Sequence, residues 1–70
     1  MDLSKKIGAL ISINRKAKNI SQEELADVSG LHPDYIGKIE RGERNPSLST
    51  LLRVLDSLSV RYSSFFKELE

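Results

Sequence analysis

The stretch from Ser21 to Gly42 constrains this chain more than any other part of it. Ser21 can cap a helix, and Glu24, three residues later, completes the pattern of a capping box. Gly30 is the residue type that accepts the left-handed conformation at a helix end. Pro33 suits the first turn of a second helix. The stretch therefore predicts two short helices joined by a tight turn at Gly30.

Apolar spacing gives each of these two helices an inner face. The inner positions are Leu25, Ala26 and Ser29 in the first helix, and Leu31, Tyr35, Ile36 and Ile39 in the second. The positions free to face elsewhere are Asp34, Gly37, Lys38 and Arg41. Small Ala26 lets the helices cross closely, and Gly42 ends the second one. The pattern predicts a helix-turn-helix, whose second helix can enter the major groove of DNA.

The same stretch resembles the Cro/repressor-type (Xre) helix-turn-helix family, and the likeness extends over nearly the whole chain. It is carried by Gln22, Glu24-Leu25-Ala26, Ser29-Gly30-Leu31, Tyr35-Ile36, Ile39-Glu40-Arg41-Gly42 and Arg44-Asn45-Pro46. The resemblance implies an all-α fold. We expect a compact five-helix lambda-repressor-like domain, with the helix-turn-helix at its second and third helices, residues 21–42.

Composition limits what the chain can do. Its 70 residues suffice for one domain, residues 1–70, and the lack of cysteine excludes disulfides and thiolate metal sites. With one histidine and no glycine-rich phosphate loop, no nucleophile–base pair or metal set can be assembled. We therefore expect no catalytic residue, no cofactor and no metal. No stretch reads as a signal peptide or is long enough to span a bilayer, which predicts a soluble cytoplasmic protein with no membrane partner.

The net charge of +1 is low for a DNA-binding protein, so the placement of charge matters more than its sum. The cations of the first helix and its exit are Lys5, Lys6, Arg15, Lys16 and Lys18. The acids Glu23, Glu24 and Asp27 share the next helix. We expect a basic face opposed by an acidic one, although an ordinary solvated surface also explains each early lysine taken singly.

Three further helices complete the expected fold. The first spans about Leu3 to Lys18 and ends before Asn19, which can adopt a left-handed stop. Within it Gly8 suggests the close approach of a neighbouring helix. The fourth helix spans roughly Leu48 to Leu58, after the cap Ser47, and its many leucines predict a central position. A short fifth helix is expected to begin near residue 63.

Arg15 has a structural role in the resembled family, where an arginine at this point pairs with a glutamate that ends the second helix of the motif. Here that glutamate is Glu40. The resemblance therefore implies an ion pair between Arg15 and Glu40 that locks two helices together. We prefer this role to a DNA contact, because losing one partner of such a pair would leave a buried charge alone.

Candidate DNA contacts follow from positions in the motif. The expected backbone contacts are Gln22, Tyr35, Arg41, Arg44 and Asn45, with the resemblance supporting Gln22 and Tyr35. The expected base readers are His32, Asp34 and Lys38. Pro33 lies among them but cannot donate a hydrogen bond, so DNA deformability is expected to supply part of the specificity. Two alternatives remain open, a half-buried core position for Tyr35 and a capping role for His32.

The last segment of the chain, residues 58–70, concentrates aromatic side chains. A set this large is hard to bury at the end of so small a domain, so part of it is expected to be covered by a second copy of the chain. The predicted dimer-interface residues are Tyr62, Phe65, Phe66 and Leu69. Which phenylalanine faces the core and which the partner stays open at this point.

These features favour a homodimeric, sequence-specific transcriptional regulator on a two-fold symmetric operator, with half-sites roughly 34 Å apart. The sequence resembles controller proteins of restriction–modification systems at Tyr35, Glu40-Arg41 and Phe65-Phe66. Phage-type repressors and antitoxins share most of these residues and stay as alternatives, as does a protein-interaction module without DNA binding. The expected partners are double-stranded DNA and a second copy, with RNA polymerase as a further candidate.

Overall fold

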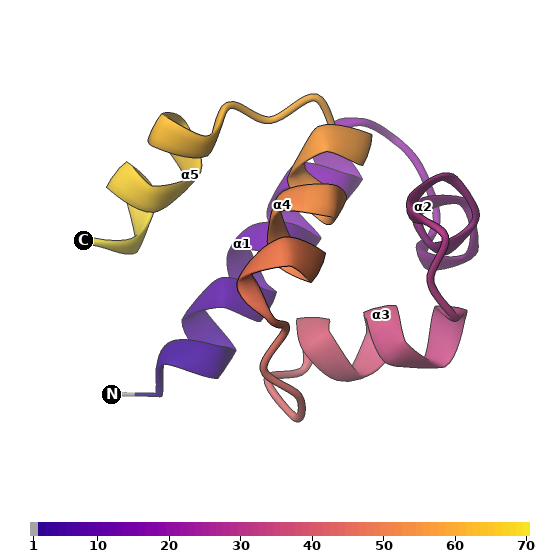
Figure 1. Cartoon of the computed structure of the whole chain (residues 1–70), viewed down its shortest axis with the longest axis horizontal. Coiled ribbons are helices and arrows are strands. Elements are labelled where there is room, and N and C mark those ends of the chain that lie inside the picture. Colours follow the sequence, from indigo (N-terminus) through magenta and orange to yellow (C-terminus); the bar gives the residue numbers. More distant parts are fainter. Residues whose placement is uncertain (1) are drawn as a thin grey trace.

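Five helices make up the part of the chain that the computed structural model describes, residues 2–70 (Figure 1). They are α1 (Leu3–Ala17), α2 (Gln22–Ser29), α3 (Pro33–Glu40), α4 (Leu48–Ser57) and α5 (Tyr62–Leu69). No strand occurs within these residues, so the expected all-α, five-helix fold is confirmed. Residue 1, the first of the predicted domain, lies outside the described residues.

Side chains at the helix starts explain the helix boundaries. Asp2 accepts a hydrogen bond from the backbone N–H of Ser4 at 2.9 Å, and Ser47 caps α4. At α2 the predicted capping box is complete: Ser21 Oγ accepts from Glu24 N at 3.0 Å, and Glu24 Oε1 accepts from Ser21 N at 2.9 Å. The start of α5 has no such side-chain bond, and this helix begins at Tyr62, one residue before the expected position.

Two turns adopt the left-handed conformation that the sequence predicted. Gly30 has φ 71° between α2 and α3, and Asn19 has φ 61° between α1 and α2. Gly42 after α3 (φ 78°) and Ser59 after α4 (φ 56°) are also left-handed. Serine does not signal this conformation in a sequence, so that turn was not predicted. The left-handed turn after α4 directs the chain toward α5, which packs back on the other helices.

All five helices contribute to one hydrophobic core. Its buried apolar residues are Ile7, Ile11, Leu25, Ala26, Ile36, Ile39, Leu51, Val54, Leu55, Leu58 and Phe65. Figure 1 shows α4 in the middle of the molecule, in front of α1, with α5 on one side and α2 on the other. This agrees with the central position predicted for the leucine-rich helix. Leu48, the first residue of α4, is an exception, because its side chain is 65% exposed.

A close helix crossing joins α1 to the end of α3. A Cβ atom at Gly8 would clash with the backbone oxygens of Ile39 and Glu40. The predicted close approach at Gly8 is therefore confirmed, and its partner is α3. This crossing holds the end of the second helix of the motif firmly against the first helix of the chain.

None of the helices within residues 2–70 has the length and apolar character needed to cross a bilayer.

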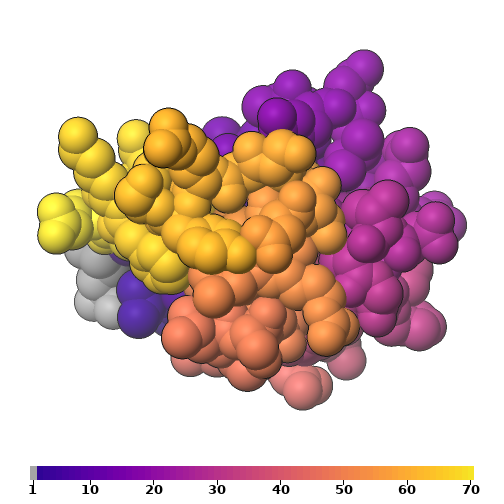
Figure 2. All heavy atoms as spheres, turned by 45° about the horizontal axis from the view of Figure 1, so that its top comes forward, coloured from indigo at the N-terminus to yellow at the C-terminus, as the bar shows by residue number. Residues whose placement is uncertain are grey.

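The two ends of the molecule are formed by different helices. Figures 1 and 2 show α5, in yellow, at one end and the α2–α3 corner, in magenta and pink, at the other.

Candidate nucleic-acid interface

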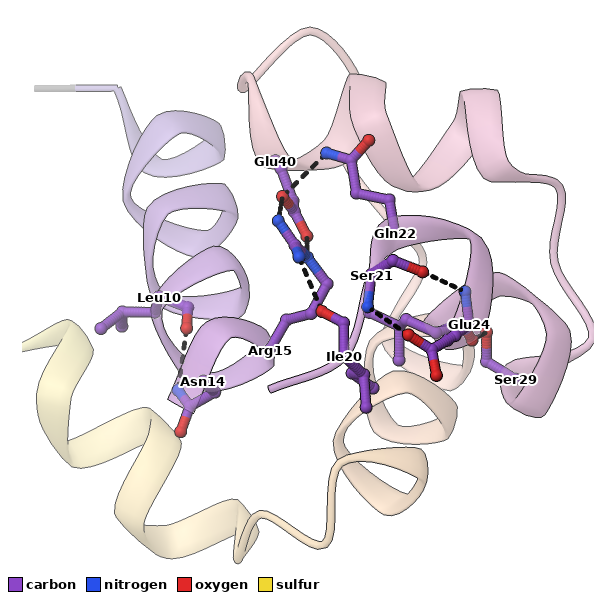
Figure 3. Close-up of polar contacts among 10 residues, drawn as sticks. Leu10, Asn14, Arg15, Ile20, Ser21, Gln22, Glu24, Ser29 and Glu40 are labelled. Carbon is purple, nitrogen blue, oxygen red and sulfur yellow. Dashed lines mark hydrogen bonds and ion pairs between the residues drawn. The ribbon is translucent and has the colours of Figure 1, made fainter. Parts of the chain in front are cut away.

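A nearly buried ion pair lies behind the α2–α3 corner (Figure 3). Arg15 of α1 donates through Nε to Glu40 Oε2 at 2.7 Å and through Nη2 to Glu40 Oε1 at 3.0 Å. The same guanidinium donates through Nη1 to the backbone oxygen of Ile20 at 2.9 Å. Both side chains are at least nine-tenths covered, with 10% of Arg15 and 6% of Glu40 exposed. The pair implied by the resemblance is thus present, and it joins α1, the loop before α2, and the end of α3.

Burial and pairing act in opposite directions on Glu40. Burial alone would raise the pKa of its carboxyl group, but hydrogen bonds from Arg15 and Gln22 outweigh burial and hold that pKa below its usual value. The Glu40 carboxylate correspondingly raises the pKa of Arg15. Both groups are therefore charged at neutral pH.

Gln22, a predicted phosphate contact, is the third member of this network. Its amide nitrogen Nε2 donates to Glu40 Oε1 at 3.0 Å, so the start of α2 is tied to the end of α3 (Figure 3). A glutamine amide carries two N–H donors, and this bond uses one. The second N–H is consequently held in a fixed direction at the amino end of α2.

The amino end of α3 carries two of the predicted base readers. His32 is its N-cap: His32 Nδ1 accepts from the backbone N–H of Asp34 at 3.1 Å. The capping role that the sequence left open for His32 is therefore observed in the structure. With Nδ1 as acceptor, the ring hydrogen is on Nε2, and both side chains are largely exposed. Lys38, the third predicted reader, is also exposed, one turn later on α3.

A hollow of about 560 Å³ separates the amino ends of α2 and α3. It is lined by Arg15, Ser21, Gln22, Glu23, His32, Pro33 and Asp34. The structure thus brings Gln22, a predicted backbone contact, next to His32 and Asp34, two predicted base readers. The two helix starts that border this hollow are capped by the side chains of Ser21 and His32.

Tyr35 and Arg44 meet beside α3. The Arg44 guanidinium lies 5.5 Å from the centroid of the Tyr35 ring, within the range of a cation–π contact. The Tyr35 ring is half-buried and packs against the core, as in the alternative left open for it. Arg44 and its neighbour Asn45 are exposed in the loop after α3. Tyr35 therefore connects that loop to the core.

Arg41, another predicted backbone contact, is paired with an acid that the sequence did not indicate. Its Nε donates to Glu43 Oε2 at 2.6 Å. The carboxylate raises the pKa of Arg41, and the guanidinium lowers the pKa of Glu43. The two residues are two positions apart, which is not a helical pairing distance, so no periodic pattern predicted them.

Gly37 was expected to be free to face away from the inner side of its helix. It is buried, because the side chains of Arg41 and Gln22 lie over it.

The expected basic face includes fewer exposed cations of α1 than the sequence indicated. Arg15 is buried in the ion pair, and Lys6 donates through Nζ to the backbone oxygen of Leu69 at 2.6 Å. The exposed cations of α1 and its exit are Lys5, Lys16 and Lys18.

The predicted dimer-interface residues separate into two groups. Phe65 is 1% exposed and fills the core, so its predicted place at an interface is corrected: its ring is not on the surface. Tyr62 and Phe66 are 40% and 38% exposed, and Leu69 is partly buried. The Tyr62 hydroxyl donates to Asp56 Oδ1 at 2.6 Å, and this bond raises the pKa of Tyr62. A groove of about 430 Å³ runs between α1 and α5, lined by Leu10, Ile13, Asn14, Ser64, Phe65 and Glu68.

Comparison with known proteins gives consistent results. The sequence model of a family described as helix-turn-helix matches residues 11–65. The control protein C.SmaI of Serratia marcescens is 44% identical over 60 residues, covering 86% of this chain and 71% of the relative. Among solved structures, the controller protein C.Esp1396I, as a tetramer in complex with its natural 35 base-pair operator, is similar with a TM-score of 0.90. It is 35% identical, covering 99% of this chain and 91% of that one.

A second solved structure supports the same grouping. The restriction–modification controller protein C.AhdI of Aeromonas hydrophila has a TM-score of 0.83 and is 39% identical, covering 96% of this chain and 91% of that one. The similarity therefore spans whole domains rather than the two-helix motif alone.

Proposed function

This chain belongs to the helix-turn-helix family of transcriptional regulators, and from that premise we propose that two copies bind a two-fold symmetric DNA operator. Its similarity to restriction–modification controller proteins over most of their length favours that subgroup over phage-type repressors and antitoxins. Binding to DNA implies the cytoplasmic location expected from the sequence. RNA polymerase is a further proposed partner, since a regulator that activates must meet it at the promoter.

The observation that carries the proposal is the network of Arg15, Glu40 and Gln22. It holds the amino end of α2 and the carboxyl end of α3 in one fixed relation, with α1 behind them. DNA recognition by this motif needs such rigidity, because phosphate contacts by α2 set the position from which α3 reads bases. The network therefore supports α3 as the helix that enters the major groove.

Roles in DNA binding follow from this placement. Gln22 is proposed to present its second amide N–H to a phosphate, and Arg41, Arg44 and Asn45 to contact phosphates beyond the other end of α3. Tyr35 holds Arg44 and contributes to the same backbone contact. The proposed base readers are His32, Asp34 and Lys38. His32 can donate from Nε2, Lys38 can donate to guanine, and Asp34 can accept from the amino group of cytosine.

The second copy is proposed to pack on the α5 end. Tyr62 and Phe66 expose aromatic surface there, and Leu69 lies beside them. This end lies away from α2 and α3, so dimerisation would leave both recognition helices free (Figure 2). In a dimer of this kind the two α3 helices are roughly 34 Å apart, one turn of DNA.

The test is selection from a pool of random duplexes with the full chain, at two salt concentrations. We expect enrichment of a two-fold symmetric sequence, and weaker binding at the higher salt because phosphate contacts release counterions. Weak binding that is equal for all duplexes would overturn the proposal. That result would favour a protein-interaction module, for which the groove between α1 and α5 is the observed candidate surface.

A further inference from the structure

Arg41 does not extend away from the protein. Its guanidinium is held by the Glu43 carboxylate, with Nε to Oε2 at 2.6 Å and Nη2 to Oε1 at 3.4 Å. It also lies along α3 rather than beyond it, because Nη1 is 3.0 Å from the place where a Cβ atom of Gly37 would be. The guanidinium at the carboxyl end of α3 is thus folded back and paired with an acid of its own chain.

This ion pair is open to solvent. Arg41 is 58% and Glu43 52% exposed in their side chains. Exposed pairs of this kind contribute little to stability, because water and salt compete for both groups. A phosphate presents the same two-oxygen acceptor that the carboxylate does, and the planar guanidinium binds either one with two parallel N–H bonds.

We propose that Glu43 is a positioning residue that competes with DNA phosphate for Arg41, and so lowers the affinity of the protein for every duplex. This rests on the proposed function, because it concerns a contact made on DNA. In the free protein Glu43 keeps Arg41 folded over Gly37. On DNA the guanidinium exchanges the carboxylate for a phosphate, and the charge of Glu43 is left beside the backbone, which weakens binding.

Gly37 completes the arrangement. Any side chain at this position would need the space that Arg41 and Gln22 now fill, since Gln22 Oε1 is 3.5 Å from the same point. The neighbouring atoms belong to the ends of flexible side chains, so they can move. Glycine therefore provides the surface on which the folded form of Arg41 rests, and Glu43 provides the bond that keeps it there.

The experiment measures affinity for the selected operator and for an unrelated duplex with four proteins: the unchanged chain, Glu43→Gln, Arg41→Ala and the double variant. Glu43→Gln keeps the size of the side chain and removes its charge. We expect it to bind both duplexes about two- to fivefold more tightly for each subunit, the scale of an exposed ion pair. In the Arg41→Ala background the same change should have little effect, because the cation it competes for is gone.

A matched control separates competition from simple charge removal. Asp27 is an exposed acid of α2, within the same motif. Asp27→Asn removes one negative charge without touching Arg41, and should change affinity much less than Glu43→Gln. Melting temperature should fall by no more than a few degrees in Glu43→Gln, because the pair is exposed and contributes little to stability.

Two results would overturn the inference while leaving the proposed function intact. One is an equal gain from Glu43→Gln with and without Arg41, and the other is an equal gain from Asp27→Asn. Either would mean that Glu43 acts only through its long-range charge. Absence of sequence-specific binding by the unchanged chain would instead contradict the proposed function itself.

Discussion

Arg15 and Glu40 lose most of their contact with water on folding, and each depends on the other to remain charged. Their two hydrogen bonds and the bond from Arg15 to Ile20 replace the water that burial removes. Removing one partner of such a pair costs more stability than forming the pair provides, because the partner left behind is an uncompensated buried charge. In this protein Glu40 also accepts a hydrogen bond from Gln22, so the ion pair connects the stability of the fold to the proposed DNA-binding site.

Replacing Arg15 by alanine should therefore lower the free energy of unfolding by about 3–5 kcal/mol. This approaches the whole stability of a small domain, so the denaturation midpoint should fall steeply. Chemical denaturation followed by circular dichroism would measure it. The matched variant is Lys16→Ala, the exposed neighbour on α1, which should cost little. Equal losses for the two variants would contradict a structural role for the pair.

The pH dependence of stability follows from the direction of the Glu40 shift. The folded state lowers the pKa of Glu40, so this group stabilises the fold fully above its unfolded pKa of about 4.3. That stabilisation should be lost as the pH falls through the lower, folded pKa. We expect the unfolding free energy to decrease as the pH falls from the unfolded pKa of Glu40 through its lower, folded pKa. In Glu40→Gln the decrease should be visibly smaller, and identical curves would exclude Glu40 as a source.

Arg44 offers a residue-level test of the phosphate contacts. It is exposed and its guanidinium lies over the face of Tyr35, so Arg44→Ala should leave the fold unchanged. Affinity should fall by a similar factor for all duplexes. The slope of log affinity against log salt should decrease by about one. A slope equal to that of the unchanged chain would remove Arg44 from the set of phosphate contacts.

At the scale of helices, the crossing of α1 and α3 depends on a glycine for space. Backbone oxygens at the end of α3 fill the space next to Gly8, whereas flexible side chains cover Gly37. The two glycines occupy helix interiors and both lower helix propensity, so they differ mainly in what surrounds them.

We therefore expect opposite results from the same substitution at these two positions. Gly8→Ala should destabilise by about 1–3 kcal/mol, because the two helices must move apart. Gly37→Ala should be neutral or raise stability by up to about 1 kcal/mol through helix propensity. Thermal unfolding of the two variants compares them directly. Similar melting temperatures would mean that the α1–α3 crossing is looser than the structure shows.

The whole molecule places its two surfaces at opposite ends. The α2–α3 corner carries the candidate DNA contacts, and α5 carries the exposed rings of Tyr62 and Phe66. Lys6 and Asp56 hold α5 in place through its last carbonyl group and its first side chain. This separation suits a protein that works as a pair of copies on one DNA.

Phe65 and Phe66 should give different phenotypes, although they are adjacent. Phe65→Ala removes a ring from the core and should cost about 3–5 kcal/mol of stability. Phe66→Ala should leave the fold nearly unchanged and shift the monomer–dimer equilibrium toward monomer. Sedimentation and thermal unfolding would distinguish the two effects. A Phe66→Ala variant that dimerises as tightly as the unchanged chain would exclude this ring from the interface.

Local patterns were enough to predict the helix-turn-helix, because its features depend on near neighbours. The capping box at Ser21 and the left-handed residues Gly30 and Asn19 follow from side-chain chemistry within a few positions. The same reason explains why all five helices were expected close to their observed bounds. The pairing of Arg15 with Glu40, 25 residues apart, came from the family resemblance rather than from any local rule.

Tertiary structure alone decided which side chains are buried in the core and which contact other side chains at the surface. Phe65 and Phe66 are chemically identical, and only the packing of α5 places one ring in the core and the other at the surface. The burial of Gly37, the pairing of Arg41 with Glu43 and the use of Lys6 to hold α5 likewise depend on contacts between side chains that local periodicity does not encode. The sequence by itself determined the helices and the motif, since these depend on short-range chemistry. The folded arrangement determined which charges are free to meet DNA.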